Sequence, residues 1–395
     1  MQKGYWENGC KLQFDGIVTA TEETERGLLV RFEETYFYPE SGGQLADGGT
    51  VGGVTIVDAQ QDDTGPFVIL PSGSLVDVDQ HLLCVVDVEK RGRHTQLHSA
   101  QHILSRLLDD MGIRTLSFHM TEEEASIEIE VATLSGDVLA QVEDAVERTI
   151  WQCLPVDTLF VEAADIAAYD VRKVPELAGG PLRLVRIGNL DTNPCGGTHV
   201  ASTGEIGAFA IIRTDKVRGN TRLYFVAGRT ATAHYRRNEA VLRGVEQQLT
   251  CGVGDIVASI SKLHQRDHDL TAQVKGLLVM AADDLAHRAL DEITSNGIAV
   301  MVLEGIPIEL AHMVTARLTS PPGPVCVLIY PGSGSEGQFA CSVPTGSEAL
   351  LATFSARMKE TFGARSGGAG RVIQGKVDVH MTPEQLKSLL TAEQA

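Results

Sequence analysis

Two short motifs constrain this chain more than any other feature, because their side chains must meet if they bind a common ion. The first is H-S-A-Q-H, in which His98 and His102 are four residues apart. On a helix this spacing places both imidazoles on the same face, one turn apart. The second is C-G-G-T-H, in which two glycines allow a tight turn between Cys195 and His199. Nitrogen and sulfur donors of this kind select Zn²⁺, so we expect one zinc ion per chain.

The number of ligands leaves the role of this zinc open. Four protein ligands complete a tetrahedron, which is typical of structural zinc, whereas a catalytic zinc keeps one position open. A catalytic site would need one ligand to yield to water or substrate, or an expanded coordination during the reaction. His94, one turn before His98, is interpreted more simply as a solvated residue of the first helical turn than as part of the same pocket.

Other hydrolase classes fit these residues less well. A zinc deaminase requires H-x-E and C-x-x-C, and neither surrounds the motifs. A metalloprotease requires H-E-x-x-H, but Ser99, Ala100 and Gln101 separate the two histidines and provide no general-base glutamate. The chain also contains no G-x-S-x-G motif, so a serine nucleophile of that type is not expected.

Length, hydropathy and cysteine content limit the classes of protein to which this chain can belong. A chain of 395 residues exceeds the size of one compact core, so two or three domains are expected. No apolar run reaches the roughly 18 residues of a membrane-spanning helix, and the N-terminus lacks the apolar core of a signal peptide. The seven cysteines are scattered and odd in number, which indicates reduced thiols and a cytoplasmic location.

The strongly acidic balance limits the interactions with nucleic acid. A formal net charge of −19 argues against a general nucleic-acid binder, because phosphate neutralisation requires clustered Lys and Arg. A local basic groove on an acidic protein remains compatible with this charge. We therefore expect any RNA affinity to be weak and sensitive to salt.

The hydrophobic pattern predicts an α+β protein built from four segments. These are a small β-barrel with a glycine-rich loop (1–92), an α+β zinc-binding domain (93–230), a helical hairpin or short coiled coil broken near Cys251 (231–293) and an α/β domain (294–395). The first helix of the zinc-binding domain starts near Thr95, and its apolar residues recur at helical spacing; they are Leu97, Ile103, Leu104, Leu107 and Leu108. The third segment has apolar residues at steps of three, four and seven, which leaves open a homodimer formed through a coiled coil. These apolar residues are Ile260, Leu263, Leu270, Val274 and Leu277.

The same motifs resemble a known family. H-T-Q-L-H-S-A-Q-H-I-L-S, followed by N-P-C-G-G-T-H-V, is similar to the editing domain shared by alanyl-tRNA synthetase, the AlaX proteins and, more distantly, threonyl-tRNA synthetase. Y-F-Y-P-E-S-G-G-Q resembles the glycine-rich Y-P-x-G-G-G-Q motif of AlaX, with Ser41 where glycine is more usual. The last domain resembles the C-terminal domain of alanyl-tRNA synthetase. Since no aminoacylation domain is left over, the resemblance is to the long, freestanding form of AlaX.

The resemblance implies a zinc-dependent hydrolase that removes serine, with glycine as a further candidate, from mischarged tRNA(Ala). An alanine site admits such near-isosteric amino acids because it cannot exclude them fully. Carried over to this sequence, the metal ligands are His98, His102, Cys195 and His199. The substrate pocket would be formed by Gly42, Gly43, Gln44, Gln101 and His119. The competing hypothesis is a non-catalytic RNA-binding protein with a structural zinc, which the four-ligand count favours.

The last domain is expected to bind tRNA or to dimerise. An acidic chain needs a local basic surface to hold a polyanion, and the stretch G-A-R-S-G-G-A-G-R-V-I-Q-G-K-V provides Arg365, Arg371 and Lys376 among glycines. The simpler interpretation is that these residues are ordinary surface charges on a flexible turn.

Overall fold

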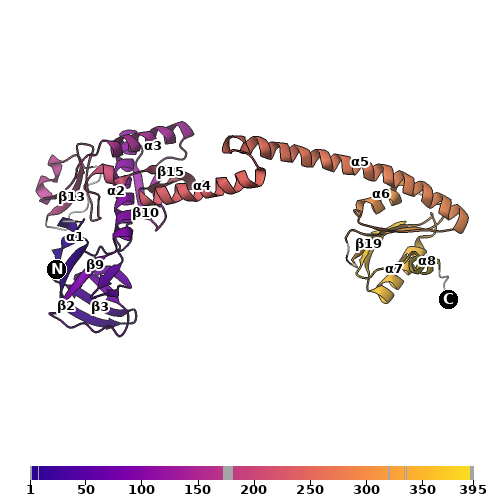
Figure 1. The fold of residues 1–395 in the computed structure, drawn as a ribbon, viewed down its shortest axis with the longest axis horizontal. Helices are drawn as coiled ribbons and strands as arrows, with labels where there is room; N and C mark the ends of the chain where they lie inside the picture. The colour runs from indigo at the N-terminus through magenta and orange to yellow at the C-terminus, as the bar shows by residue number, and fades with distance from the viewer. Residues whose placement is uncertain are drawn as a thin grey trace. The chain divides into compact units, whose positions relative to one another are not determined.

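The computed structural model describes residues 2–7, 9–171, 181–318, 321–332, 334 and 336–391. Its contacts divide the chain into two compact units, one ending at Gly244 and the other starting at Val245 (Figure 1). Helices and sheets alternate in both units, which fits the α+β class. Within the described residues, no helix is long and apolar enough to cross a membrane.

The first part of unit 1 is a seven-stranded antiparallel sheet in the order β6-β5-β9-β2-β3-β8-β7. The long strand β2 pairs with β9 from Gln13 to Ile17 and with β3 from Val18 onward, and the β2–β3 ladder has a register shift between Val18 and Ala20. This irregularity curls the sheet around a core that includes Phe14, Phe32 and Leu70. Among the described strands β6 and β7 do not pair, so the sheet is curled, and the small barrel expected for this segment stays a prediction. The strands are β2 (Gln13–Thr24), β3 (Gly27–Phe32), β5 (Gly49–Val51), β6 (Val54–Thr55), β7 (Asp58–Asp62), β8 (Gly65–Leu70) and β9 (His81–Val86).

The second part of unit 1 packs two helices on a four-stranded sheet of order β10-β11-β16-β15. Helix α2 begins at Val88, earlier than the predicted start near Thr95, because the Asp87 carboxylate caps it by accepting from the amides of Glu89 and Lys90. Its apolar face joins the core as its periodicity predicted, through Leu97, Ile103, Leu104 and Leu108. The elements are α2 (Val88–Asp110), β10 (Thr115–Met120), β11 (Ala125–Ile129), α3 (Gly136–Trp151), β15 (Phe209–Val217) and β16 (Asn220–Ala227).

A smaller three-stranded sheet, β12-β13-β14, completes unit 1. Its last strand ends at Pro194, directly before Cys195, so this sheet positions the start of the C-G-G-T-H motif. Unit 1 also contains the short elements β1, α1 and β4 near the N-terminus. The remaining elements are β1 (Gln2–Lys3), α1 (Gly4–Glu7), β4 (Glu34–Thr35), β12 (Val156–Val161), η1 (Ala163–Ala168), β13 (Leu182–Ile187), β14 (Asp191–Pro194) and η2 (Thr203–Ile206).

Helices α4 (Arg229–Leu249) and α5 (Ile256–Asn296) follow, separated by the predicted break near Cys251 and by η3 (Val253–Asp255). As far as Leu277, α5 leaves its apolar stripe exposed, with Leu263 at 51% and Leu277 at 65%. The rest of α5 instead packs against α6 (Glu309–Arg317) through Leu285, Ala289 and other buried residues. Packing of α4 against α5 as a hairpin stays a prediction.

Unit 2 contains a mixed five-stranded sheet of order β17-β18-β19-β21-β20, in which only β17 and β18 pair in parallel. Alternate residues of the fully buried β18 contribute to two different cores: Val327 faces α5 and α6, whereas Leu328 lies in the core with α7 and α8. The strands and helices predicted for this segment therefore form one sheet with helices packed on both of its faces. The elements are β17 (Ala299–Glu304), α6 (Glu309–Arg317), β18 (Val325–Tyr330), β19 (Gly337–Ser342), α7 (Glu348–Phe362), β20 (Arg365–Ala369), β21 (Val372–Val377) and α8 (Pro383–Thr391).

Candidate metal centre

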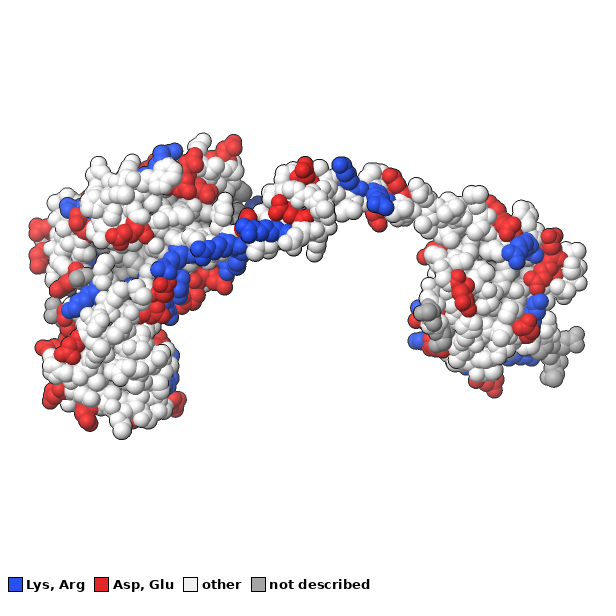
Figure 2. Space-filling view, viewed as in Figure 1, with Lys and Arg blue, Asp and Glu red and all other residues white. Residues whose placement is uncertain are grey.

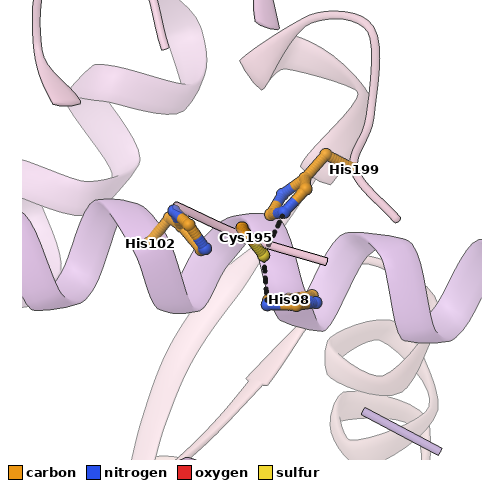
Figure 3. A group of neighbouring side chains, drawn as sticks. All are labelled: His98, His102, Cys195 and His199. Atoms are coloured by element: carbon orange, nitrogen blue, oxygen red, sulfur yellow. Dashed lines mark hydrogen bonds between the residues drawn. The ribbon is translucent and has the colours of Figure 1, made fainter. Parts of the chain in front are cut away.

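The four side chains of the two motifs meet in unit 1 (Figure 3). The candidate ligand atoms of His98, His102, Cys195 and His199 all lie within 4.8 Å of one another. The Cys195 Sγ is 3.3 Å from His199 Nε2 and 3.5 Å from His98 Nε2. Three imidazoles and one thiol at these separations form a donor set that one metal ion could bridge, and this set is compatible with zinc.

Local geometry explains why these residues converge. His98 and His102 project from successive turns of α2, and the β13–β14 hairpin ends at the loop 195–199, which we call the metal loop. A Cβ atom on Gly197 would lie 2.1 Å from His98 Cε1, closer than real contacts allow. Only glycine therefore lets the metal loop approach α2 closely enough for Cys195 to reach the histidines.

Each of the three histidines has a buried partner at its other ring nitrogen. His98 Nδ1 is 2.7 Å from Gln44 Oε1, and His199 Nδ1 is 3.2 Å from Ser99 Oγ. His102 Nδ1 is 3.4 Å from Asp191 Oδ2. The contacts with Gln44 and Ser99 hold the rings of His98 and His199 with Nε2 toward the sulfur, which is the arrangement in which metal-binding histidines are usually held. No local pattern in the sequence marks Asp191 or Ser99 for this role.

The electrostatics of the cluster favour a thiolate. Burial opposes ionisation of Cys195, but the three neighbouring histidines outweigh it and hold its pKa well below the usual 9.0. Burial lowers the pKa of His199 to about 3, so this ring is neutral. Burial also acts against charge on His102, yet Cys195 and Asp191 raise its pKa to about 9. A metal ion bound here would displace the His102 proton, as is usual for histidine ligands.

A cavity of about 700 Å³ opens beside the cluster. Three of the four candidate ligands contribute to its wall, so an ion held there would be accessible to a small molecule. Further lining residues include Tyr38, Ser41, Gly42, Gln101, Arg114, Thr115, Phe118 and Asn193. Gln101 thus lies where the pocket was expected.

His119 faces away from the cavity, contrary to expectation. Side chains alternate along a strand, and on β10 it is Phe118 that faces the site, with its ring stacked on His98 at 5.3 Å between centroids. His119 is exposed on the opposite side of the strand. His94 also differs from its interpretation as a solvated residue, because it is fully buried, with Nε2 3.5 Å from Glu122.

The glycine-rich loop both lines the cavity and contacts a ligand of the metal centre. Gly42, at φ +57°, lines the cavity, and Gly43, at φ +84°, lies so close to Phe118 that a Cβ would be 2.5 Å from its carbonyl oxygen. Ser41 does not have a positive φ, so it replaces a glycine without strain. The Gln44 side chain is fully buried and does not line the cavity; it holds His98 and accepts from the Thr198 amide at 3.1 Å.

The predicted tRNA-binding cations lie on the β20–β21 hairpin of unit 2. Arg365 and Lys376 are cross-strand partners, but Arg365 is 3.9 Å from Asp378 and Lys376 is 3.1 Å from Glu336. Arg371, in the turn, donates to Thr345 Oγ1 at 3.0 Å. In Figure 2, Lys and Arg are interspersed with Asp and Glu over this unit. Basic side chains also follow α4, where three arginines pair with Glu89, Glu123 and Glu239. The α4 arginines are Arg229, Arg236, Arg237 and Arg243.

Comparison with known proteins finds similarity to one domain family and to several full-length proteins. Residues 182–224, which include the metal loop, match the family described as the threonyl and alanyl tRNA synthetase second additional domain. The chain is 30% identical to alanyl-tRNA editing protein Aarsd1 of Danio rerio over 248 residues, which cover 62% of this chain and 60% of that protein. It is 26% identical to Aarsd1 of Rattus norvegicus over 96% of this chain and 92% of that protein.

A third relative is alanine–tRNA ligase of Streptococcus mutans, 30% identical over 66% of this chain and 31% of that enzyme. The residues that match the synthetase domain lie in the part of unit 1 that carries the metal loop. The chain is similar to the AlaX-like alanyl-tRNA editing proteins, as its motifs indicated. The aligned region spans 60% of the zebrafish protein and 64% of the bovine one.

Proposed function

We propose that this protein is a zinc-dependent aminoacyl-tRNA deacylase that hydrolyses Ser-tRNA(Ala), with Gly-tRNA(Ala) as a further candidate substrate. The observation that supports this most is the His₃Cys cluster in the wall of an open cavity. The names of the relatives support the choice of alanyl-tRNA. An aminoacyl ester is an activated acyl group, so hydrolysis does not require a nucleophilic triad.

The buried donor set fits zinc, which His98, His102, Cys195 and His199 would hold. When bound, the ion would supply Lewis-acid polarisation or an anchor for the terminal ester. The residues of the chain position the substrate. Gln101 Nε2 donates to Ser105 Oγ at 2.8 Å, which fixes the carboxamide and leaves Oε1 to accept a hydrogen bond from a serine hydroxyl. Phe118 packs on His98 and keeps one side of the site apolar.

A second candidate function is a non-catalytic RNA-binding protein with a structural zinc. Four protein ligands favour it, because a complete tetrahedron leaves no position for water. Exposure of three ligands to the cavity favours the enzyme instead. The two hypotheses differ in whether the ester is cleaved at all.

The first prediction is that the protein releases serine from Ser-tRNA(Ala) only when metal is present. A chelator should abolish release, and stoichiometric Zn²⁺ should restore it, because the ion acts on the ester and does not merely hold the fold. Acid-precipitable labelled serine is measured over time, with circular dichroism checking the fold. The His119→Ala protein is the matched control, since this histidine lies outside the cavity, and it should keep full activity. A zinc-loaded protein that binds the tRNA without cleaving it would establish the structural-zinc hypothesis.

The second prediction concerns unit 2, which we propose binds tRNA or a second copy of the chain. A protein ending at Gly244 keeps the metal centre and most of α4. It should retain zinc. Its KM for full-length tRNA should rise about tenfold while kcat changes little, because the lost contacts bind the substrate and the transition state equally. Charge reversal at Arg365 and Arg371 should give a milder increase and a shallower salt dependence. An unchanged KM, together with loss of a dimer in sedimentation, would assign unit 2 to dimerisation through the exposed stripe of α5.

A further inference from the structure

Arg183 is a buried cation that the proposed reaction does not use. It lies on β13, is 7% exposed, and has no carboxylate in ion-pair contact among the residues that the structure describes. Burying a guanidinium without a counter-charge is costly unless its donors are satisfied. The groups that satisfy them therefore indicate what this residue does.

The guanidinium donates chiefly to the backbone of the metal loop. Arg183 Nη1 donates to the carbonyl oxygens of Cys195 at 2.7 Å and Gly197 at 2.9 Å. Its Nε donates to the carbonyl oxygen of Trp6 at 3.2 Å, and its Nη2 to Thr158 Oγ1 at 3.3 Å. One side chain thus connects the metal loop, the N-terminal helix α1 and strand β12.

Trp6 completes this network. Its indole Nε1 donates to the carbonyl oxygen of Gly196 at 3.0 Å. The three successive carbonyls of residues 195–197 therefore all accept hydrogen bonds, two from Arg183 and one from Trp6. The Cys195 amide in turn donates to the Arg183 carbonyl at 3.2 Å. A loop with two glycines would otherwise have many backbone conformations, and these bonds select one of them.

We propose that Arg183 is a positioning residue of the metal centre: its guanidinium, together with the Trp6 indole, holds the backbone of residues 195–197 so that Cys195 and His199 keep the spacing that one zinc ion requires. Arg183 does not line the cavity, so it acts through the loop and not on the substrate. The inference depends on the proposed metal site but not on the identity of the tRNA.

The alternative is that Arg183 only attaches the N-terminal helix to the rest of unit 1. Both roles predict a less stable protein when it is changed, so stability cannot separate them. Metal affinity and coordination geometry can, because a merely structural residue leaves the preformed ligands unchanged. Lysine is the informative replacement: it keeps the charge, but its ammonium cannot span four acceptors in a fixed plane as a guanidinium does.

The experiment compares Arg183→Lys with the wild-type protein by competitive titration of Zn²⁺ and by the absorption spectrum of the Co²⁺-substituted full chain. Zinc affinity should fall about 10- to 100-fold, as for other outer contacts of metal ligands. The thiolate-to-Co²⁺ charge-transfer band should weaken. With Ser-tRNA(Ala), kcat should fall while KM stays the same. Arg186→Lys is the matched control: Arg186 lies on the same strand but pairs with Asp157 at the surface, and its replacement should change none of these values.

Trp6→Phe provides a second variant in case Arg183→Lys does not fold. It keeps an aromatic ring and removes only the donor to Gly196, so zinc affinity should fall about two- to tenfold. A folded Arg183→Lys protein with wild-type zinc affinity and an unchanged Co²⁺ spectrum would overturn the proposal. If Arg183→Lys does not fold, unchanged zinc affinity in Trp6→Phe would overturn it. Absence of zinc binding in the wild-type protein would instead refute the metal site itself.

Discussion

The Cys195→Ala and His102→Ala proteins should be purified with less than about a tenth of the zinc of the wild-type protein and should be more than about 100-fold slower on Ser-tRNA(Ala). Changes to the outer contacts of metal ligands already cost about 10- to 100-fold, so loss of a ligand should exceed that range. Cys195 contributes the only thiol of the cluster, at 3.3 Å from His199 Nε2 and 3.5 Å from His98 Nε2. His102 contributes one of the three imidazoles, and its Nδ1 is 3.4 Å from Asp191 Oδ2.

Metal analysis by mass spectrometry and single-turnover deacylation measure the two effects. Cys251→Ala and His119→Ala are matched controls, because each removes the same chemical group outside the cluster. Both should retain full zinc and activity. If the two cluster variants kept full occupancy, the metal site would be wrongly assigned, whatever their activity.

The largest effect on substrate choice should be discrimination between serine and alanine on the same tRNA. We expect Ser-tRNA(Ala) to be hydrolysed about one to two orders of magnitude faster than Ala-tRNA(Ala). A pocket group that accepts a hydrogen bond from the serine hydroxyl is left unpaired when alanine binds, at a cost of roughly 1–3 kcal/mol. Gln101, which lines the cavity and is held by Ser105, is the group we propose for this contact.

Gln101→Leu tests that assignment, because leucine is similar in volume but accepts no hydrogen bond. The kcat/KM for Ser-tRNA(Ala) should fall toward the value for Ala-tRNA(Ala), which should itself change little. A panel with Gly-tRNA(Ala) shows whether the smaller amino acid is also accepted. Equal rates of the wild-type protein on the serine and alanine esters would contradict an editing function, because such an enzyme would destroy the correct product.

The sequence alone was sufficient to select the four residues of the candidate metal centre. Each has a side chain that binds metal, and within each motif the spacing is local: one helical turn joins His98 to His102, and a glycine turn joins Cys195 to His199. Amphipathic periodicity likewise predicted the buried face of α2, including Leu97 and Leu104, because a helix repeats the same angle at every step. These features depend only on neighbouring residues.

Tertiary structure decided everything that depends on contacts between distant segments. The partners of the ligands come from elsewhere in the chain: Gln44 reaches His98 from the glycine-rich loop, and Asp191 reaches His102 from β14. Likewise, strand pairing determined that Phe118 and not His119 faces the cavity. Arg183 has no motif around it, and its role follows only from where β13 places it under the metal loop. Such contacts are set by sheet register and packing over many residues, and no local pattern encodes them.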